Sequence, residues 1–325
     1  MKLQILIPQY NETDAVIKPL LDSIELQQNV DLQNDVGVVI VNDGSDVILS
    51  DNLLKRYSFR IEYHLEKHRG VSATRNACLD YATADYVMFC DADDMFYNAC
   101  GLFIVFREFQ NGGFDSLVSA FIEESRHPET KEPLYINHDM DSTFVHGKVH
   151  RRQYLIDNNI RWNEDLTIHE DSYFNCLCHR LAEVTKYSQT SFYLWKWRDN
   201  SVCRHDPKYI LKTYNNMLDS NTALVDQLLS RGMDNEAQYY AVSMIYDAYF
   251  TMNKDEWLNQ ENLEYRMATE RRFKEYWLRF RYLHDSISQQ DKAQIIMGIK
   301  GRMYGEGMLL ESMTFADWIK IVEGL

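Results

Sequence analysis

The 325-residue sequence predicts an α/β domain followed by a mostly α-helical domain. Runs of Leu, Ile and Val at residues 3–8 and 36–42 are typical of strands that are buried on both faces of a parallel sheet. From Pro207 onward, strand patterns give way to helical periodicity. We therefore expect an α/β domain at residues 1–206 and a helical domain at residues 207–325.

The elements of the first domain follow in order along the chain. Val16, Leu20 and Ile24 are spaced four apart, which predicts a helix with one apolar face between the first two strands. Pro19 fits such a helix only near its first turn. A strand at 61–65, a small-residue helix at 71–82 and a strand at 86–90 complete the order β-α-β-β-α-β. Further expected elements are a helix at 102–109, a strand at 116–122 and a polar turn at 126–133.

The second domain is expected to consist of helices at 209–229, 236–252, 263–283 and 289–300. The third of these carries a basic cluster interleaved with aromatic residues. Its members are Arg266, Arg271, Arg272, Lys274, Arg279 and Arg281. A charged helix face over a buried aromatic stripe explains this pattern, and a phosphate-bearing or oligomeric partner is the alternative.

Composition restricts the classes of protein to consider. The net charge is −15 and the isoelectric point is near 5.1, so the chain lacks a general basic field for nucleic acid or anionic lipid. Its six cysteines form no CxxC pair, which favours reduced thiols and a cytoplasmic location. No stretch is apolar enough for a signal peptide or a transmembrane segment.

Three acids directly follow the strand at 86–90. Asp91, Asp93 and Asp94 should therefore lie at the carboxyl edge of the sheet, where open α/β sheets bind ligands. Carboxylate oxygens suit Mg²⁺ or Mn²⁺, and a nucleotide diphosphate would complete the coordination of either ion. Spacing alone leaves a solvated acidic turn open as the alternative.

The loops that close the first two strands also carry candidate binding residues. Tyr10 could stack on a nucleobase, and Asp43 could accept hydrogen bonds from a base or ribose while Gly44 allows a tight turn. An ordinary turn and a helix entry are the alternatives. Neither a GxGxxG sequence after the first strand nor a GxxxxGK[ST] sequence occurs, so metal and side chains must meet the diphosphate charge.

Another acidic pair, Glu170 and Asp171, begins a helix-like stretch. Acids are favoured in a first helical turn by the helix dipole, which is one explanation. The other is catalysis, because an Asp can accept the proton of a hydroxyl within hydrogen-bond reach.

In combination, these segments resemble the family 2 glycosyltransferases. The matching pieces are IPQYNE, VIVNDGS, HRGVSATRNACLDYATADYVMFCDADD and IHEDSYFN, in that order, and the resemblance spans roughly residues 1–205. It implies a GT-A fold, a nucleotide-diphosphate sugar donor and inversion at the anomeric carbon.

The resemblance also implies roles for individual residues. It places Pro8, Tyr10 and Glu12 around the base, Asp43 on the base or ribose, Arg75 and Asn76 near the donor, and Asp91 on the ribose. It makes Asp93 the ligand of a Mn²⁺ or Mg²⁺ ion and Asp171, beside Glu170, the catalytic base. His205 is a further candidate metal ligand, and Arg198, Arg204 or His205 could face the diphosphate.

Two aromatic groups have no assigned role. His146 and His150 are expected at a strand end or in an acceptor cleft. Trp195 and Trp197 alternate around Lys196, so they should share one side of a strand, as a floor for a sugar or as core.

The predicted function is an inverting transfer of a hexose or N-acetylhexosamine from a UDP-sugar to an acceptor hydroxyl. A glycan, a teichoic-acid-like polymer and a modified nucleobase of DNA are all compatible acceptors. The C-terminal helices are expected to bind the acceptor or to form a homo-oligomer. A sugar-nucleotide nucleotidyltransferase and a non-catalytic sugar- or nucleic-acid-binding module are the alternatives.

Overall fold

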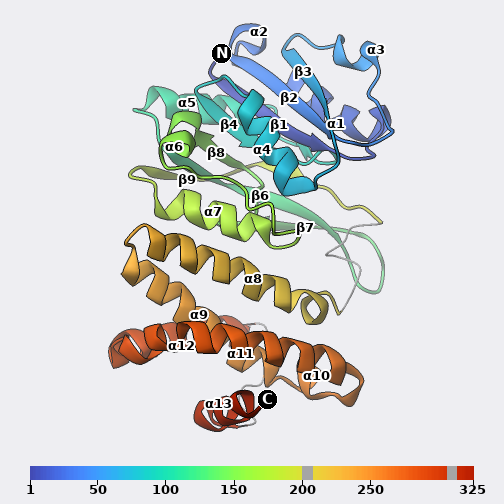
Figure 1. The fold of residues 1–325 in the computed structure, drawn as a ribbon. Helices are drawn as coiled ribbons and strands as arrows, with labels where there is room; N and C mark the ends of the chain where they lie inside the picture. The colour runs from blue at the N-terminus through green and yellow to red at the C-terminus, as the bar shows by residue number, and fades with distance from the viewer. Residues whose placement is uncertain (200–207, 306–312) are drawn as a thin grey trace. The chain divides into compact units, whose positions relative to one another are not determined.

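The computed structural model describes residues 1–199, 208–305 and 313–325. The chain forms two compact units, Met1–Ser201 and Val202–Leu325. The predicted boundary after residue 206 lies outside the described residues, so the assignment of two domains with separate roles stays a prediction. Figure 1 shows the helices and strands of each unit.

The first unit alternates strands and helices. Its elements are β1 (Leu3–Gln9), α1 (Asp14–Glu25), α2 (Leu32–Asp35), β2 (Val36–Asp43), α3 (Asp51–Leu54), β3 (Arg60–Glu66), α4 (Val71–Tyr81), β4 (Tyr86–Phe89), β5 (Met95–Phe96), α5 (Gly101–Gln110), β6 (Ser116–Arg126), β7 (Pro133–His138), β8 (Lys148–Arg151), α6 (Arg152–Asp157), α7 (Glu170–Arg180) and β9 (Thr185–Trp195).

The strands of this unit form one mixed sheet in the order β3-β2-β1-β4-β8-β6-β9-β5, with β7 paired to β6. Strands β3, β2, β1 and β4 run parallel, whereas β8 pairs antiparallel with both β4 and β6. Every residue of β2 is buried, as its run of β-branched residues predicts. Register places Gln9 opposite Asn42 and Leu6 opposite Phe89, so the segments that follow β1, β2 and β4 meet at one edge.

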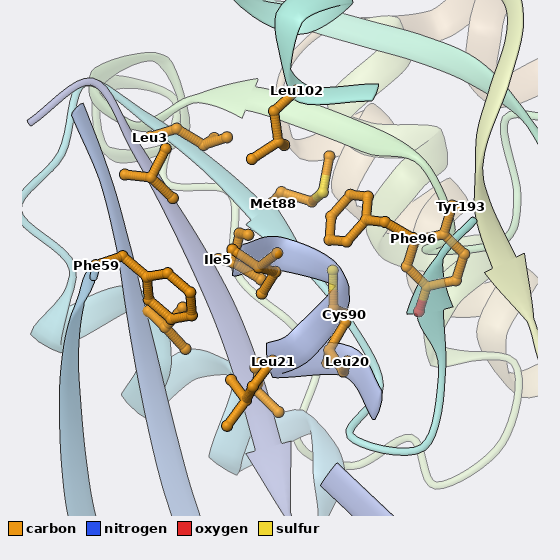
Figure 2. Close-up of a cluster of buried hydrophobic side chains, with 14 of the residues drawn as sticks. Leu3, Ile5, Leu20, Leu21, Phe59, Met88, Cys90, Phe96, Leu102 and Tyr193 are labelled. Carbon is orange, nitrogen blue, oxygen red and sulfur yellow. The ribbon is translucent and has the colours of Figure 1, made fainter. Parts of the chain in front are cut away.

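A large apolar core covers one face of this sheet (Figure 2). Its labelled members are Leu3, Ile5, Leu20, Leu21, Phe59, Met88, Cys90, Phe96, Leu102 and Tyr193. Another aromatic cluster forms where Phe174 of α7 stacks on Trp162 at 4.1 Å and both rings meet Phe89 edge-on. Small residues such as Ala73 and Cys78 line α4, which packs against β1 and β2.

Three details differ from the sequence prediction. Pro19 lies inside α1 rather than near its first turn. Strand β6 continues to Arg126, because β7 pairs with its second half. Strand β9 ends at Trp195, so Trp197 lies beyond the strand and does not share a strand face with Trp195.

The second unit is helical, as predicted. Its described elements are α8 (Tyr209–Ser230), α9 (Asp234–Met252), α10 (Asp255–Leu258), a 3-10 turn (Gln260–Asn262), α11 (Leu263–Ser286), α12 (Gln289–Gly305) and α13 (Phe315–Gly324). Phe273, Tyr276, Trp277 and Phe280 of α11 are buried, which is the aromatic stripe that its sequence predicts. Among the described helices, none has a run of apolar residues that would cross a membrane.

Several cations of the α11 basic cluster are paired with acids. Arg272 bonds to Asp219, Arg279 to Asp226 at 2.8 Å, and Arg266 to Glu270 at 2.8 Å. These contacts support the explanation of a charged helix face packed onto its neighbours.

Candidate active site

A buried arginine organises the carboxyl edge of the sheet. Arg75 of α4 is 4% exposed, and its guanidinium lies 4.4 Å from the ring of Trp162. One nitrogen, Nη1, donates to Glu170 at 3.0 Å and to Asp171 at 2.9 Å, while Nη2 donates to Asp91 at 2.9 Å. Arg75 therefore joins the acidic segment after β4 to the acidic pair at the start of α7, which are far apart in the sequence.

The environment of Asp171 suits a proton acceptor. Its Oδ2 accepts a hydrogen bond from the backbone N–H of Val145 at 3.2 Å, which fixes the carboxylate. Burial, together with the charges of Glu170 and Asp91, raises the pKa of Asp171 to about 7, although Arg75 opposes the shift. A carboxylate with such a pKa can take a proton near neutral pH.

Asp93 belongs to a separate ion pair at the same edge. Its Oδ2 accepts a hydrogen bond from Arg198 Nη1 at 2.5 Å, and the same nitrogen lies 3.9 Å from Glu12 Oε1. Burial raises the pKa of Glu12, and the nearby charge of Asp93 adds to this effect. The backbone N–H of Tyr10 donates to Glu12 at 2.6 Å, so the first loop is tied to this pair.

The third acid of the motif is buried. Asp94 is 1% exposed and accepts hydrogen bonds from the Tyr193 hydroxyl at 2.6 Å and the Lys196 backbone N–H at 2.9 Å. Burial and the neighbouring carboxylates raise the pKa of Asp94 well above its usual range.

Among the described residues, Asp91, Asp94 and His146 offer ligand atoms that all lie within 4.8 Å of one another. Carboxylate oxygens and an imidazole nitrogen match the preferences of Mn²⁺. The acidic edge therefore fits a divalent cation, which either these three residues or Asp93 would hold.

The loop after β2 is shaped by Asp43. Its Oδ1 accepts the backbone N–H of Arg69 at 2.8 Å and its Oδ2 that of Gly70 at 3.0 Å, which anchors the start of α4. Next to it, Gly44 has φ of +70°, and a Cβ there would lie 2.4 Å from the backbone nitrogen of His68. Only glycine satisfies both conditions.

An aromatic pair lies above this loop. Tyr10 is 47% exposed, and its ring stacks on His68 at 4.6 Å with 25° between the planes. The predicted stacking of Tyr10 on a base stays a prediction. Pro8 is half-buried on β1.

Asn76 binds the segment that precedes α7. Its side chain donates to the Trp162 carbonyl at 2.9 Å and to Glu164 at 3.0 Å, and accepts from the Trp162 N–H at 2.9 Å. These bonds fix the segment that places Trp162 under Arg75. The structure thus brings Arg75, Asp91, Glu170 and Asp171 together, and Glu12 with Asp93, whereas His205 lies outside the described residues.

Two contributions were missed by the sequence prediction. Trp162, which the chain supplies from an irregular segment, has no motif that would reveal it. Lys148 of β8 is buried, donates to the His146 carbonyl at 3.1 Å, and has its pKa lowered to about 8 by burial. A lysine inside the run HGKVH was the only available signal. His150 on the same strand is buried against Ser116, and burial lowers its pKa to about 3.

Comparison with known proteins decides the family. The model of the family described as "Glycosyl transferase family 2" matches residues 4–174, which is more than half of the chain. The chain belongs to glycosyltransferase family 2. The predicted activity class is thereby confirmed, and this glycosyltransferase carries its acidic edge inside the matched region.

Curated relatives are similar over part of their length. The glycosyltransferase is 26% identical to the uncharacterized glycosyltransferase EpsJ of Bacillus subtilis over 222 residues, 62% of each chain. It is 25% identical to the glycosyltransferase GlyA of Streptococcus pneumoniae, over 62% of this chain and 32% of GlyA. It is 28% identical to the minor teichoic acid biosynthesis protein GgaB of B. subtilis, over 52% of this chain and 20% of GgaB. The chain thus spans less than two thirds of these relatives.

Solved structures show the same fold. Residues 1–349 of S. aureus TarS, in complex with UDP, superpose with a TM-score of 0.61 at 17% identity, over 94% of this chain and 92% of TarS 1–349. The mannosyltransferase PcManGT of Pyrobaculum calidifontis, in complex with GDP-Man and Mn²⁺, superposes with a TM-score of 0.52 at 13% identity. This match covers 99% of this chain and 84% of PcManGT. The predicted GT-A fold followed by C-terminal helices is therefore confirmed.

Proposed function

We propose that this glycosyltransferase moves a hexose or N-acetylhexosamine from a UDP-sugar to an acceptor hydroxyl, with inversion. The observation that carries the proposal is the double contact of Arg75 with Asp91 and Asp171. One rigid guanidinium sets a ribose-binding acid and a base at a fixed separation, as a single displacement requires.

In the proposed reaction, Asp171 accepts the proton of the acceptor hydroxyl as that oxygen attacks the anomeric carbon. Glu170 accepts a hydrogen bond from the same Arg75 nitrogen as Asp171, and its charge helps to raise the pKa of Asp171. Tyr10 stacks on the base, with Pro8, Glu12 and Asp43 around the base and ribose. Asn76 acts through Trp162 as a positioning residue.

A Mn²⁺ or Mg²⁺ ion held by Asp93 would neutralise the departing diphosphate, and His205 is a further candidate ligand. The Mn²⁺ complex of PcManGT supports a divalent ion, and the UDP and UDP-GlcNAc complexes of TarS support the UDP donor. Three acceptor classes are compatible with this reaction: a glycan, a teichoic-acid-like polymer and a modified nucleobase. The similarity to GgaB favours the teichoic-acid-like polymer. The helical unit is assigned to acceptor binding or homo-oligomerisation.

The proposal is tested by a screen of nucleotide sugars, including GDP-mannose. Release of the nucleoside diphosphate is measured by chromatography with Mn²⁺ and with chelator, for the wild type and Asp171→Asn. We expect Mn²⁺-dependent release from a UDP-sugar, a reduction of about 10²–10⁴-fold in Asp171→Asn, and unchanged UDP binding in calorimetry.

Asp165→Asn is the matched control, because Asp165 is an exposed acid of the segment before α7. Release by Asp171→Asn at the wild-type rate would exclude Asp171 as the base. Release from GDP-mannose alone would exclude the UDP donor.

A further inference from the structure

The site contains two arginines whose surroundings differ. Arg75 is 4% exposed, is held by three carboxylates and lies against Trp162, so it cannot move without leaving three half-buried acids without this partner. The side chain of Arg198 is 34% exposed, and it reaches Asp93 from the segment after β9. Arg198 is therefore the more exposed of the two and is not enclosed by three carboxylates.

The backbone around Arg198 is fixed independently of its guanidinium. The N–H of Lys196 donates to Asp94 at 2.9 Å, and the N–H of Trp197 donates to Glu124 at 3.2 Å. Rotation of the long Arg198 side chain would therefore leave these two backbone contacts in place.

Arg198 lies close to both Asp93, the proposed metal-binding acid, and Glu12. Its Nη1 is 2.5 Å from Asp93 Oδ2 and 3.9 Å from Glu12 Oε1. The charge of Asp93 raises the pKa of Glu12 and that of Arg198 lowers it, so the guanidinium offsets the repulsion between the two carboxylates. The positive charge of Arg198 opposes the approach of a metal ion to Asp93, so the two cations compete for this carboxylate.

We propose that Arg198 is an exchangeable counter-ion, which occupies Asp93 in the donor-free enzyme and leaves it when a divalent cation and a nucleotide diphosphate bind together. The inference rests on the proposed function, because it takes Asp93 as the metal-binding carboxylate. A cation that binds alone must displace a paired guanidinium. When the diphosphate is also present, the displaced guanidinium gains a new anion as partner. Each ligand therefore strengthens the other, and Arg198 carries part of that coupling.

The experiment measures Mn²⁺ binding by the electron paramagnetic resonance signal of the free ion, with and without UDP. Arg198→Gln removes the charge and keeps a polar side chain. We expect it to bind Mn²⁺ alone about two- to fivefold more tightly than the wild type, because it removes a competing ion pair. With saturating Mn²⁺, we expect its affinity for UDP to fall about tenfold, through loss of a charge-assisted hydrogen bond.

Arg161→Gln is the matched control, since the Arg161 side chain is 38% exposed and pairs with Asp80 outside the acidic edge. It should leave both affinities unchanged. In an Asp93→Asn background, Arg198→Gln should no longer strengthen Mn²⁺ binding.

The outcomes separate the two proposals. If the wild type binds Mn²⁺ with UDP but Arg198→Gln binds Mn²⁺ alone no more tightly, the exchange is excluded while the proposed metal-dependent donor site stands. If the wild type binds no Mn²⁺ in the presence of UDP, both are overturned.

Discussion

At the scale of single residues, the charge on Asp171 depends on groups from three parts of the chain. Burial and the acids Glu170 and Asp91 favour its neutral form, whereas Arg75 favours the carboxylate. The resulting pKa of about 7 means that a modest change of any neighbour changes the fraction of active base.

This balance predicts the pH dependence of transfer. Below pH 7 Asp171 is protonated and cannot accept a proton, so the transfer rate should rise with pH and level off above about 7. Glu170→Gln removes a negative charge that raises the pKa of Asp171, so the rising limb should move to lower pH by about 1 unit. Initial rates at saturating donor between pH 5 and pH 9 check this, with Asp165→Asn as the control. A shift to higher pH would contradict the assignment of Asp171 as the titrating base.

At the scale of elements, the strands could be predicted because burial on both faces leaves a continuous apolar run, as in β2. The ends of β1, β2 and β4 were predictable for the same reason, and they placed Tyr10, Asp43 and Asp91 at one edge. Contacts across long sequence separations were not predictable. The pairing of Arg198 with Asp93 depends on β9 reaching this edge through β5 and β6, and no local pattern encodes that path.

The turn after β2 gives a prediction at this scale. Gly44→Ala would force a left-handed residue and place Cβ 2.4 Å from the His68 backbone nitrogen. We expect a loss of about 2–4 kcal/mol in the free energy of unfolding, since backbone strain and overpacking add. Urea denaturation monitored by circular dichroism measures it.

Gly112→Ala is the control for this substitution. Gly112 has φ of +92° with nothing within 4 Å of an added Cβ, so it carries the strain without the clash. Gly112→Ala should therefore lower the free energy of unfolding by about 1–2 kcal/mol. Equal losses in the two variants would show that contact with His68 does not restrict position 44.

At the scale of the whole molecule, charge bears on the choice of acceptor. The net charge of −15 opposes approach to a polyanion, and the helical unit would have to supply a local basic track. In that unit, however, Asp219 bonds to Arg272 and Asp226 to Arg279. Two of the six cations of the α11 basic cluster are therefore paired with acids of α8, and the sequence of α11 alone does not reveal this pairing.

We therefore expect the enzyme to bind short duplex DNA more weakly than about 100 µM at physiological ionic strength, the weak end of non-specific binding. Fluorescence anisotropy of labelled DNA at several salt concentrations measures this. The double variant Asp219→Asn, Asp226→Asn removes the α8 acids that pair with Arg272 and Arg279 and lowers the net negative charge from −15 to −13. It should therefore bind DNA more tightly, with a steeper salt dependence. Micromolar, salt-dependent binding by the wild type would contradict the internal pairing of these arginines and favour a nucleobase acceptor over a glycan or teichoic-acid-like polymer.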